Sequence, residues 1–543
     1  MKQIGKHALA RIVALSLAAA GAPAFAQAVN WTVIGSSSSA VPMPPMQAAS
    51  DRVIGSMGWS DGGQGRWGYS SSQSSDDGLW ARSPNGTLQR YMAPGVIGAA
   101  GPGRSGAEFG HVFGQRFDQA YDSGRDGRRA FVARAGIANQ YSDGVWLWDG
   151  TRNVEIARSV ANAGALGPGL GPDWRFNTGD RYALLRVGNG GEVLIDTSVV
   201  HSGGSTSELI TKYVPGVGNR ACAMPLQTDP LLSPGLGTDV FSHWVGAGSR
   251  SVDANGRMYA QLLTEGFRTG VWEVCNGAPR ALAVDAETAA RGPGIPLAPE
   301  AVFATFNTGA VLGAPGLVNF IATVFLTPQS GSPTNGVYRN SGASNRPLAL
   351  AGDTGDLSPH WNGATFSSFV WESLDAGGSY VTFSAYVNTA GGSRVGIWRA
   401  GKPAGPQPVA IIGDTGAYGP GGGLAWSSFS ERSITAGGDI VVIAKTSDGT
   451  DGVWRLSESN APVRLLGVGD AITVPTSAGT AQATVTAISS SGGANAARPA
   501  SGRDTWIGTD GSALLNVRTT FSDYTLWITA PATDRIFADG FNG

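Results

Sequence analysis

A recurring unit, about 60 residues long, limits what this chain can fold into more than any other feature, because a fixed long period is the signature of a repeat architecture. Each unit contains a glycine followed by a run in which apolar and polar residues alternate. Such alternation places every second side chain on one face, so each run is predicted to be a half-buried β-strand. The glycine recurs at nearly even intervals, at Gly65, Gly127, Gly191, Gly256, Gly316, Gly378, Gly438 and Gly511.

An aromatic residue follows the landmark glycine at a similar distance in each unit, mostly as the last member of a Gly-Val/Ile/Leu-Trp/Tyr triplet. The third unit lacks it and has Leu209 roughly at that place. A residue type that recurs at one structural position indicates packing between units, so these aromatics are interpreted as core residues. They are Trp80, Trp146, Trp272, Tyr338, Trp398, Trp454 and Trp527.

Each unit has room for about four short strands, which predicts an all-β fold of the β-propeller type. One such unit cannot bury both faces of its sheet and must stack on its neighbours. We expect a single propeller over residues 27–530 with eight blades, or seven if the irregular last unit is partly loop. The last unit lacks a closing strand. Residues 31–39 resemble the closing strands of the other units. The N-terminal strand is therefore predicted to complete the C-terminal blade, and an open superhelix is the alternative.

Residues 1–26 have the features of a secretory signal peptide. Lys2, Lys6 and Arg11 precede an apolar stretch that is too short to span a bilayer, and small residues follow at the cleavage site. A secreted, periplasmic or cell-surface location is expected. In such an oxidising compartment, a disulfide between Cys222 and Cys275 is the favoured interpretation of the two cysteines.

The charge balance disfavours nucleic acid and anionic membranes as partners. Without the basic residues of the signal peptide the net charge changes from −2 to −5, and only 14% of the residues are charged. The sequence contains no basic cluster, and no stretch after the signal peptide reads as membrane-spanning. A polysaccharide or an envelope protein is the expected partner, and the chain is expected to be a monomer.

The chain resembles secreted bacterial tandem-repeat proteins of propeller type that have no assigned activity. The resemblance is carried by residues 378–385, the Gly-Val/Ile-Trp triplets and the Gly-Asp-Thr-Gly turns. The resemblance spans the mature chain and implies a fold and a compartment, but no catalytic residue. The ending Ile-Phe-Ala-Asp-Gly-Phe, within residues 531–543, is similar to the IFxDGF ending of many secreted Gram-negative proteins. It is interpreted either as a sorting or anchoring signal or as a frayed terminus.

Histidines provide the weak candidates for catalysis. His111, His243 and His360 lie in the same part of their units, ahead of the landmark glycine, where the innermost strand or the loop entering it is predicted. One interpretation has them converge near the axis, to bind a metal or accept a proton. The favoured interpretation is that they are scattered. A lyase-like site would combine His243 with Tyr259 and Arg250.

Aromatic residues outside the repeat are the better candidates for ligand binding, because an exposed ring can stack on a sugar. We select Trp174, Trp244, Trp361 and Trp426, with Trp371 in addition, and expect half or more of them to be buried. Asp-rich loops at residues 122–127 and 447–452 offer weak calcium sites, but hairpin turns are the favoured interpretation. No cofactor is expected.

The sequence contains no nucleophile elbow, P-loop, zinc-protease or dinucleotide motif. The favoured function is a secreted, non-enzymatic propeller whose loops bind glycans or other envelope components. The first alternative is a secreted carbohydrate-active enzyme of the polysaccharide lyase kind, with its site at the mouth of the channel. A structural envelope protein is the second.

Overall fold

The computed structural model describes residues 30–36, 58–60, 66–71, 78–82, 88–110, 121–123, 127–137, 140–159, 164–177, 184–244, 250–253, 255–308, 310–327, 332–401, 405–458, 461–476, 479–490, 506–507 and 513–529. The predicted signal peptide and C-terminal tail lie outside these residues. Among the helices that the structure describes, none is long and apolar enough to cross a membrane.

The described strands form eight antiparallel sheets. The first contains β2 (Gly58–Ser60), β3 (Arg66–Ser71), β4 (Gly78–Arg82) and β5 (Leu88–Met92). The second contains β6 (Glu108–Phe109), β7 (Tyr121–Ser123), β8 (Arg129–Ile137), β9 (Gln140–Trp148) and β10 (Asn153–Arg158). The third contains β11 (Trp174–Phe176), β12 (Leu184–Val187), β13 (Val193–His201), β14 (Thr206–Val214) and β15 (Gly218–Ala223). The fourth contains β16 (Phe241–Trp244), β17 (Arg250–Val252), β18 (Met258–Thr264), β19 (Thr269–Val274) and β20 (Arg280–Val284).

The fifth sheet contains β21 (Val302–Phe306), β22 (Val311–Leu312), β23 (Val318–Phe325), β24 (Thr334–Asn340) and β25 (Asn345–Leu350). The sixth contains β26 (Thr365–Phe369), β27 (Asp375–Gly377), β28 (Tyr380–Thr389), β29 (Gly392–Ala400) and β30 (Gln407–Ile411). The seventh contains β31 (Trp426–Ile434), β32 (Ile440–Thr446), β33 (Asp451–Leu456) and β34 (Val463–Gly467). The eighth contains β35 (Ala471–Thr476), β36 (Gly479–Ser490), β37 (Ala513–Thr519), β38 (Asp523–Thr529) and β1 (Asn30–Ser36).

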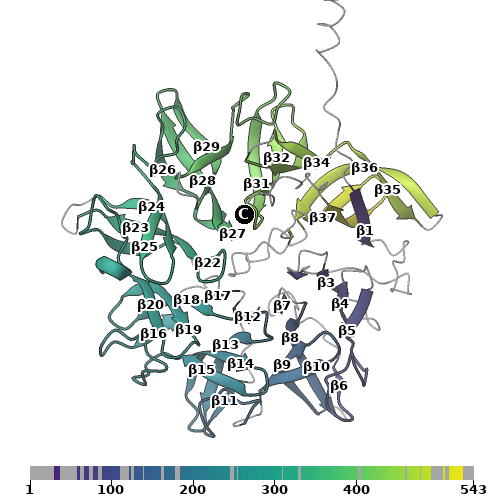
Figure 1. Ribbon diagram of the computed structural model, residues 1–543. Coiled ribbons are helices and arrows are strands. Elements are labelled where there is room, and N and C mark those ends of the chain that lie inside the picture. Colours follow the sequence, from purple (N-terminus) through teal and green to yellow (C-terminus); the bar gives the residue numbers. More distant parts are fainter. Residues whose placement is uncertain are drawn as a thin grey trace, which may run out of the picture.

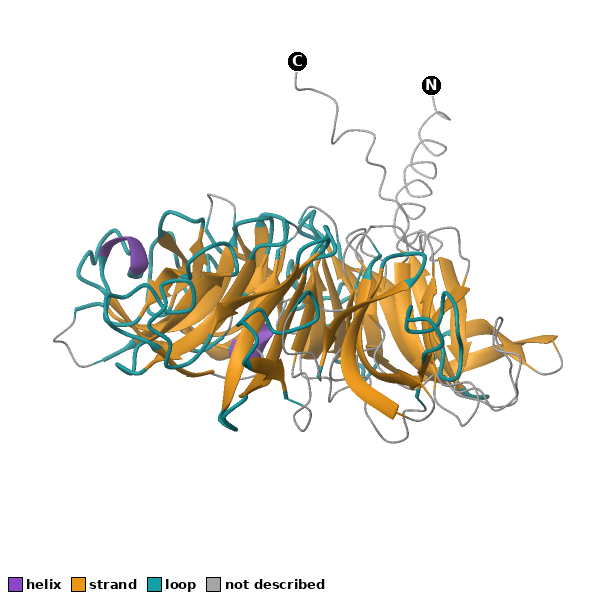
Figure 2. Ribbon diagram, turned by 90° about the horizontal axis from the view of Figure 1, so that it is seen from below, coloured by secondary structure: helices purple, strands orange, loops and turns teal. Residues whose placement is uncertain are grey.

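The sheets stand around a ring, and the segments β7, β12, β17, β22 and β27 lie nearest its middle (Figure 1). Seen from the side, the ring is a flat disc with loops on both faces and two short 3-10 helices, η2 (Ala289–Arg291) and η3 (Trp371–Ser373) (Figure 2). The predicted all-β propeller is therefore confirmed.

The N-terminal strand closes the ring as predicted. β1 pairs antiparallel with β38, with Trp31 opposite Ile528 and Thr32 opposite Trp527. A strand from the start of the chain thus completes the sheet built by its end, which removes one exposed sheet edge.

The first strand is divided into two segments in five of the described sheets. In the sixth, β26 pairs with the end of β28, and β27 pairs with its start. The short chain segment between them leaves the sheet at its free edge. In the sixth sheet, the segment between β26 and β27 contains η3. Its residues are therefore more exposed than they would be in a continuous strand paired with β28.

Six landmark glycines that the structure describes, from Gly127 to Gly438, lie in the turn between the first and second strands of a sheet. Gly378 has a φ of +56°, which side chains with a Cβ rarely adopt. A Cβ there would lie 2.5 Å from the backbone oxygen of Ala436 in the next sheet. The repeat thus records both a left-handed turn and a close approach of neighbouring sheets.

The glycine of the Gly-x-Trp triplet is needed because the aromatic ring folds back over it. A Cβ at Gly396 would lie 2.7 Å from the Trp398 ring, and one at Gly270 would lie 2.9 Å from the Trp272 ring. Trp272 and Trp398 are fully buried and pack against the preceding sheet, which confirms their interpretation as core residues.

The third sheet keeps this arrangement with different residues, and the placement of Leu209 at the aromatic position is wrong by two residues. The register shift that follows Val271 in β19 follows Ile210 in β14, so Thr211 occupies the position of Trp272. Leu209 stands where the other sheets have glycine. Because Thr211 is much smaller than a tryptophan, the Leu209 side chain has room there, and it is fully buried.

The predicted disulfide is confirmed. Cys222 in β15 is bonded to Cys275, just after β19, with an S–S distance of 2.06 Å. The bond joins the third and fourth sheets across their junction.

Candidate functional site between the fifth and sixth sheets

A Pro-Gly turn recurs in the segments that connect successive sheets, and sequence inspection missed it. Its glycines all have positive φ: Gly103, Gly169, Gly235, Gly294 and Gly421. Between the fifth and sixth sheets the turn reads Pro359-His360, and His360 keeps the left-handed backbone with a φ of +48°. The signal in the sequence is the single histidine in an otherwise regular series of Pro-Gly pairs.

Two residues other than glycine adopt a left-handed conformation in the turn of residues 360–363, hereafter the 360–363 turn. They are His360 and Asn362, each with a φ of +48°. This conformation costs an L-residue about 1–2 kcal/mol, although histidine and asparagine tolerate it better than most. Backbone strain of this kind is concentrated at binding and catalytic sites.

The ring of His360 is held by the start of the outermost strand of its sheet. Its Nδ1 lies 3.0 Å from the backbone oxygen of Pro406. A carbonyl only accepts hydrogen bonds, so Nδ1 carries the proton and Nε2 is the acceptor atom of the neutral ring. A Cβ at Gly405 would lie 2.7 Å from Cε1 of His360, so glycine at this position makes room for the ring.

The neighbouring groups are aromatic and polar. Trp361 is partly buried against the core between the fifth and sixth sheets, and its backbone oxygen accepts a 2.8 Å hydrogen bond from Ala364. Asn362 and Asp356 are exposed. The loop therefore presents an imidazole acceptor, part of an indole ring, an amide and a carboxylate to solvent.

A second exposed aromatic lies just beyond the other end of β26. Trp371 opens η3 and is 53% exposed. The helix is fixed by Ser373, whose Oγ donates to Val370 O and accepts a 2.8 Å hydrogen bond from the amide of Ser384. Arg432 of the seventh sheet donates to Ser373 O.

His360 lies in the loop that enters β26, the first strand of its sheet, which is one of the two predicted places. Its ring contacts Pro406 at the start of β30, the outermost strand. The side chains of His111 and His243 lie outside the described residues. Convergence of the three histidines stays a prediction that His360, as placed, does not support.

The combination of Tyr259 with Arg250 in one pocket is contradicted by the register of β17 and β18. Arg250 is opposite Ala260 and Ser251 is opposite Tyr259, so Arg250 and Tyr259 point to opposite faces of the sheet. Arg250 is buried and its Nε lies 2.7 Å from Oδ2 of Asp196 in the third sheet. Burial raises the pKa of Asp196 to about 6, although the Coulomb attraction of Arg250 acts against the shift.

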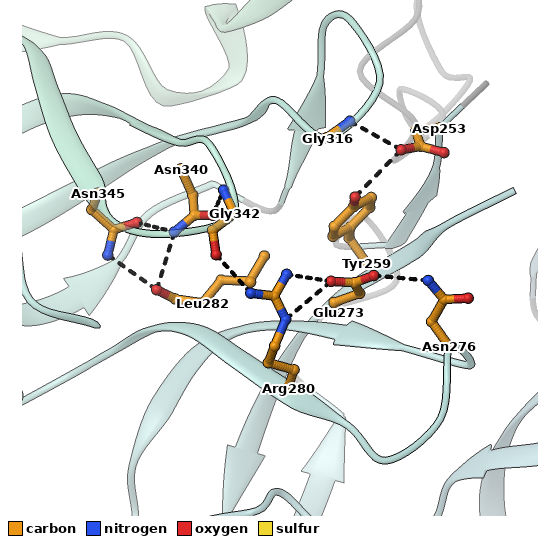
Figure 3. Close-up of polar contacts among 10 residues, drawn as sticks. All are labelled: Asp253, Tyr259, Glu273, Asn276, Arg280, Leu282, Gly316, Asn340, Gly342 and Asn345. Carbon is orange, nitrogen blue, oxygen red and sulfur yellow. Dashed lines mark hydrogen bonds and ion pairs between the residues drawn. The ribbon is translucent and has the colours of Figure 1, made fainter. Parts of the chain in front are cut away.

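Tyr259 belongs to a polar network at the junction of the fourth and fifth sheets (Figure 3). Its hydroxyl donates to Asp253, which also accepts a 3.1 Å hydrogen bond from the amide of Gly316. Burial, above all, raises the pKa of Tyr259, so it is a poor proton donor or acceptor. These contacts join two sheets, which is a structural role.

Glu273 lies in the same network and accepts hydrogen bonds from Asn276 and Arg280 (Figure 3). Burial opposes its ionisation, but the hydrogen bonds outweigh burial and lower the pKa of Glu273. Arg280 also donates to Gly342 O of the fifth sheet at 2.6 Å. The carboxylate is fully engaged by protein donors.

The other ligand candidates lie apart from the 360–363 turn. Trp426 is 1% exposed and its Nε1 donates to Tyr418 O at 2.9 Å, so its proposal as a ligand platform is wrong. Trp174 is partly buried and its ring contacts His201 edge-on at 4.9 Å. The side chain of Trp244 lies outside the described residues.

The Asp-rich loop at residues 447–452 forms a hairpin turn. Asp448 Oδ1 accepts hydrogen bonds from Thr446 Oγ1 at 2.6 Å and from the Thr450 amide at 3.0 Å. Within the described part of the chain, no group of three or more His, Cys, Asp or Glu side chains is placed to hold a metal ion. The loop at residues 122–127 is only partly described.

Comparison with known proteins gives a family and a fold. The model of a family of unknown function, DUF7453, matches residues 221–509. No curated protein matches the chain. Among solved structures, an oligogalacturonate lyase from Vibrio parahaemolyticus is 8% identical, with 93% of this chain and 98% of that chain covered and a TM-score of 0.33.

Two further similar structures belong to peptidases. Prolyl oligopeptidase B from Galerina marginata is 10% identical over 80% of this chain, with a TM-score of 0.33, and the chain spans 55% of its length. The β-propeller domain of the Trilobed protease from Pyrococcus furiosus is 9% identical, with 74% of this chain and 92% of that domain covered and a TM-score of 0.29. Likeness at this level concerns fold alone and identifies no activity.

Proposed function

The chain belongs to a family of unknown function. We therefore propose its function from the 360–363 turn. We propose that the protein is a secreted, non-enzymatic β-propeller that binds glycans at this turn. The observation that carries the proposal is His360, which replaces the glycine of the other Pro-Gly turns and keeps their left-handed backbone. The ring of His360 makes one hydrogen bond, to Pro406, and otherwise stays exposed beside Trp361, which supports a role in recognition.

The exposed groups match the surface of a sugar. A pyranose has an apolar face that stacks on an indole, and hydroxyls that both donate and accept hydrogen bonds. Nε2 of His360 supplies an acceptor, and the amide of Asn362 supplies both functions. His360 is oriented by a backbone carbonyl and not by a carboxylate, which favours binding over proton transfer.

We also propose that the protein acts outside the cytoplasm. The disulfide between Cys222 and Cys275 is supported by the structure and is typical of oxidising compartments. The signal peptide at residues 1–26 remains a proposal from the sequence.

His360→Gly tests the proposal, because it restores the residue found in the other turns. Release of backbone strain offsets the lost Pro406 hydrogen bond, so we expect the free energy of unfolding to change by less than about 1 kcal/mol. Loss of one hydrogen bond to the ligand is expected to weaken glycan binding about tenfold. Binding of residues 27–543 and of the variant to a polysaccharide panel is measured with urea unfolding as the stability control.

Phe521→Ala is the matched surface control, because Phe521 is 59% exposed, has no left-handed backbone, and lies in the turn between β37 and β38 of another sheet. Unchanged binding by both His360→Gly and Trp361→Ala would contradict the proposed site. The same incubation is assayed for newly released chain ends. Release that disappears in His360→Gly would instead establish the lyase-like function, in which Nε2 of His360 accepts a proton.

A further inference from the structure

We propose that the ligand is an extended neutral glycan chain that lies along β26 and contacts Trp361 at one end and Trp371 at the other. This inference rests on the proposed glycan-binding function and specifies its ligand. It makes Trp371 a second subsite, held by contacts different from those that hold the 360–363 turn.

Trp371 stands on a rigid support. The side chain of Ser373 forms hydrogen bonds with the backbone of Val370, just before η3, and of Ser384 in β28. Arg432 connects the helix to the seventh sheet. Leu374, the next residue, is buried in the core between the fifth and sixth sheets. An exposed ring on a fixed turn loses little conformational freedom when a ligand stacks on it, which favours binding.

The strand between the two tryptophans has the length of a binding track, and its buried residues, Phe366 and Phe369, alternate with partly buried or exposed polar residues. β26 contains five residues, so it spans about 17 Å. It lies at the end of its sheet, and Ser367 is exposed along it. A single sugar ring cannot reach both ends of such a strand, whereas a linear oligosaccharide can.

The charges favour a neutral chain over a polyuronate. The exposed charged residues beside the two tryptophans, Asp356 and Glu372, are both acidic. Arg432, the cation that contacts η3, is buried and directs its guanidinium at Ser373 and Ser384. Carboxylates at both ends of the track repel an anionic polymer and accept hydrogen bonds from sugar hydroxyls.

Chain length provides the test. Neutral gluco-, manno- and xylo-oligosaccharides, from disaccharide to hexasaccharide, are titrated against residues 27–543, with oligogalacturonates of the same lengths as anionic probes. We expect affinity for the bound neutral series to rise with length. Trp371→Ala should weaken hexasaccharide binding at least fivefold and leave the shortest binding oligosaccharide unaffected. Trp361→Ala should weaken both, and Phe521→Ala neither.

The outcomes separate this inference from the proposed function. If Trp361→Ala weakens binding but Trp371→Ala has no effect at any length, the extended ligand is overturned and the glycan site stands. Tighter binding of oligogalacturonates than of every neutral series overturns the neutral chain. No binding of any oligosaccharide, with all variants folded by circular dichroism, overturns both.

Discussion

At the residue scale, substitutions at glycine positions separate packing from function. Leu209 and Thr211 together replace a glycine and a tryptophan, so their departure from the repeat is compensated within the core. His360 is compensated only by Gly405, which gives its ring room, and its own side chain stays exposed. His360 keeps the strained backbone and stays exposed beside Trp361 and Asn362, and this combination is our reason to associate it with a ligand.

Gly405→Ala should damage the candidate site more than the fold. The new Cβ would meet Cε1 of His360 at 2.7 Å and lie still closer to Asp356 O, and Gly405 has a φ of +77°. Gly449→Ala is the control, because Gly449 has a φ of +87° with no atom within 4 Å. Gly449→Ala should lose about 1–2 kcal/mol of unfolding free energy from backbone strain, and Gly405→Ala should lose more, because its Cβ also meets Asp356 O. Only Gly405→Ala should also weaken glycan binding, and equal binding by the two would contradict the coupling between Gly405 and His360.

Sequence alone predicted the all-β propeller correctly, because the landmarks it was read from are backbone and packing requirements. Gly378 marks a turn, and Trp398 marks a core position, and each recurs at a nearly fixed spacing. The site was harder to predict, because His360 and Trp361 were two candidates among many. What distinguishes His360 is its left-handed backbone in a Pro-Gly series, and φ is not visible in one sequence.

At the scale of the elements, neighbouring sheets are joined by polar contacts of different strength at one repeated position. Arg250 in β17 and Arg432 in β31 each stand opposite equivalent residues of the second strand, Ala260 and Val442. Arg250 pairs with Asp196, whereas Arg432 donates to Ser384. The pairing of Arg250 with Tyr259 failed as a prediction because alternation along β17 and β18 sends them to different junctions.

Removing one partner at each junction should have unequal effects. Asp196→Ala leaves Arg250 buried without its counter-ion and should cost about 3–5 kcal/mol of unfolding free energy. Ser384→Ala removes a neutral acceptor from Arg432 and should cost about 1–3 kcal/mol. Urea unfolding measures both. The double variant Asp196→Ala/Arg250→Met should recover part of the loss, and a double variant no more stable than Asp196→Ala would refute the buried-charge explanation.

At the scale of the whole molecule, the ring is completed by a strand from the N-terminal part of the chain. β1 contains seven residues and pairs with β38 along most of its length. Without it, β38 would present unpaired backbone N–H and C=O groups at a sheet edge, where another chain can add. The ring would also lose the contact that joins its two ends.

Deletion of residues 27–36 should therefore lower stability and create a tendency to associate. We expect a lower urea midpoint and self-association in analytical ultracentrifugation, because the free edge of β38 accepts a strand from another molecule. A synthetic peptide of residues 27–39 should restore both the midpoint and the monomer. The same peptide with Pro in place of both Trp31 and Thr32 should not, since one of two successive N–H groups in an edge strand points at its partner and proline cannot donate to the ladder. A truncated chain that stays monomeric and unfolds at the original midpoint would show that β1 contributes little, and the stability of the ring would then be assigned to the junctions between its sheets.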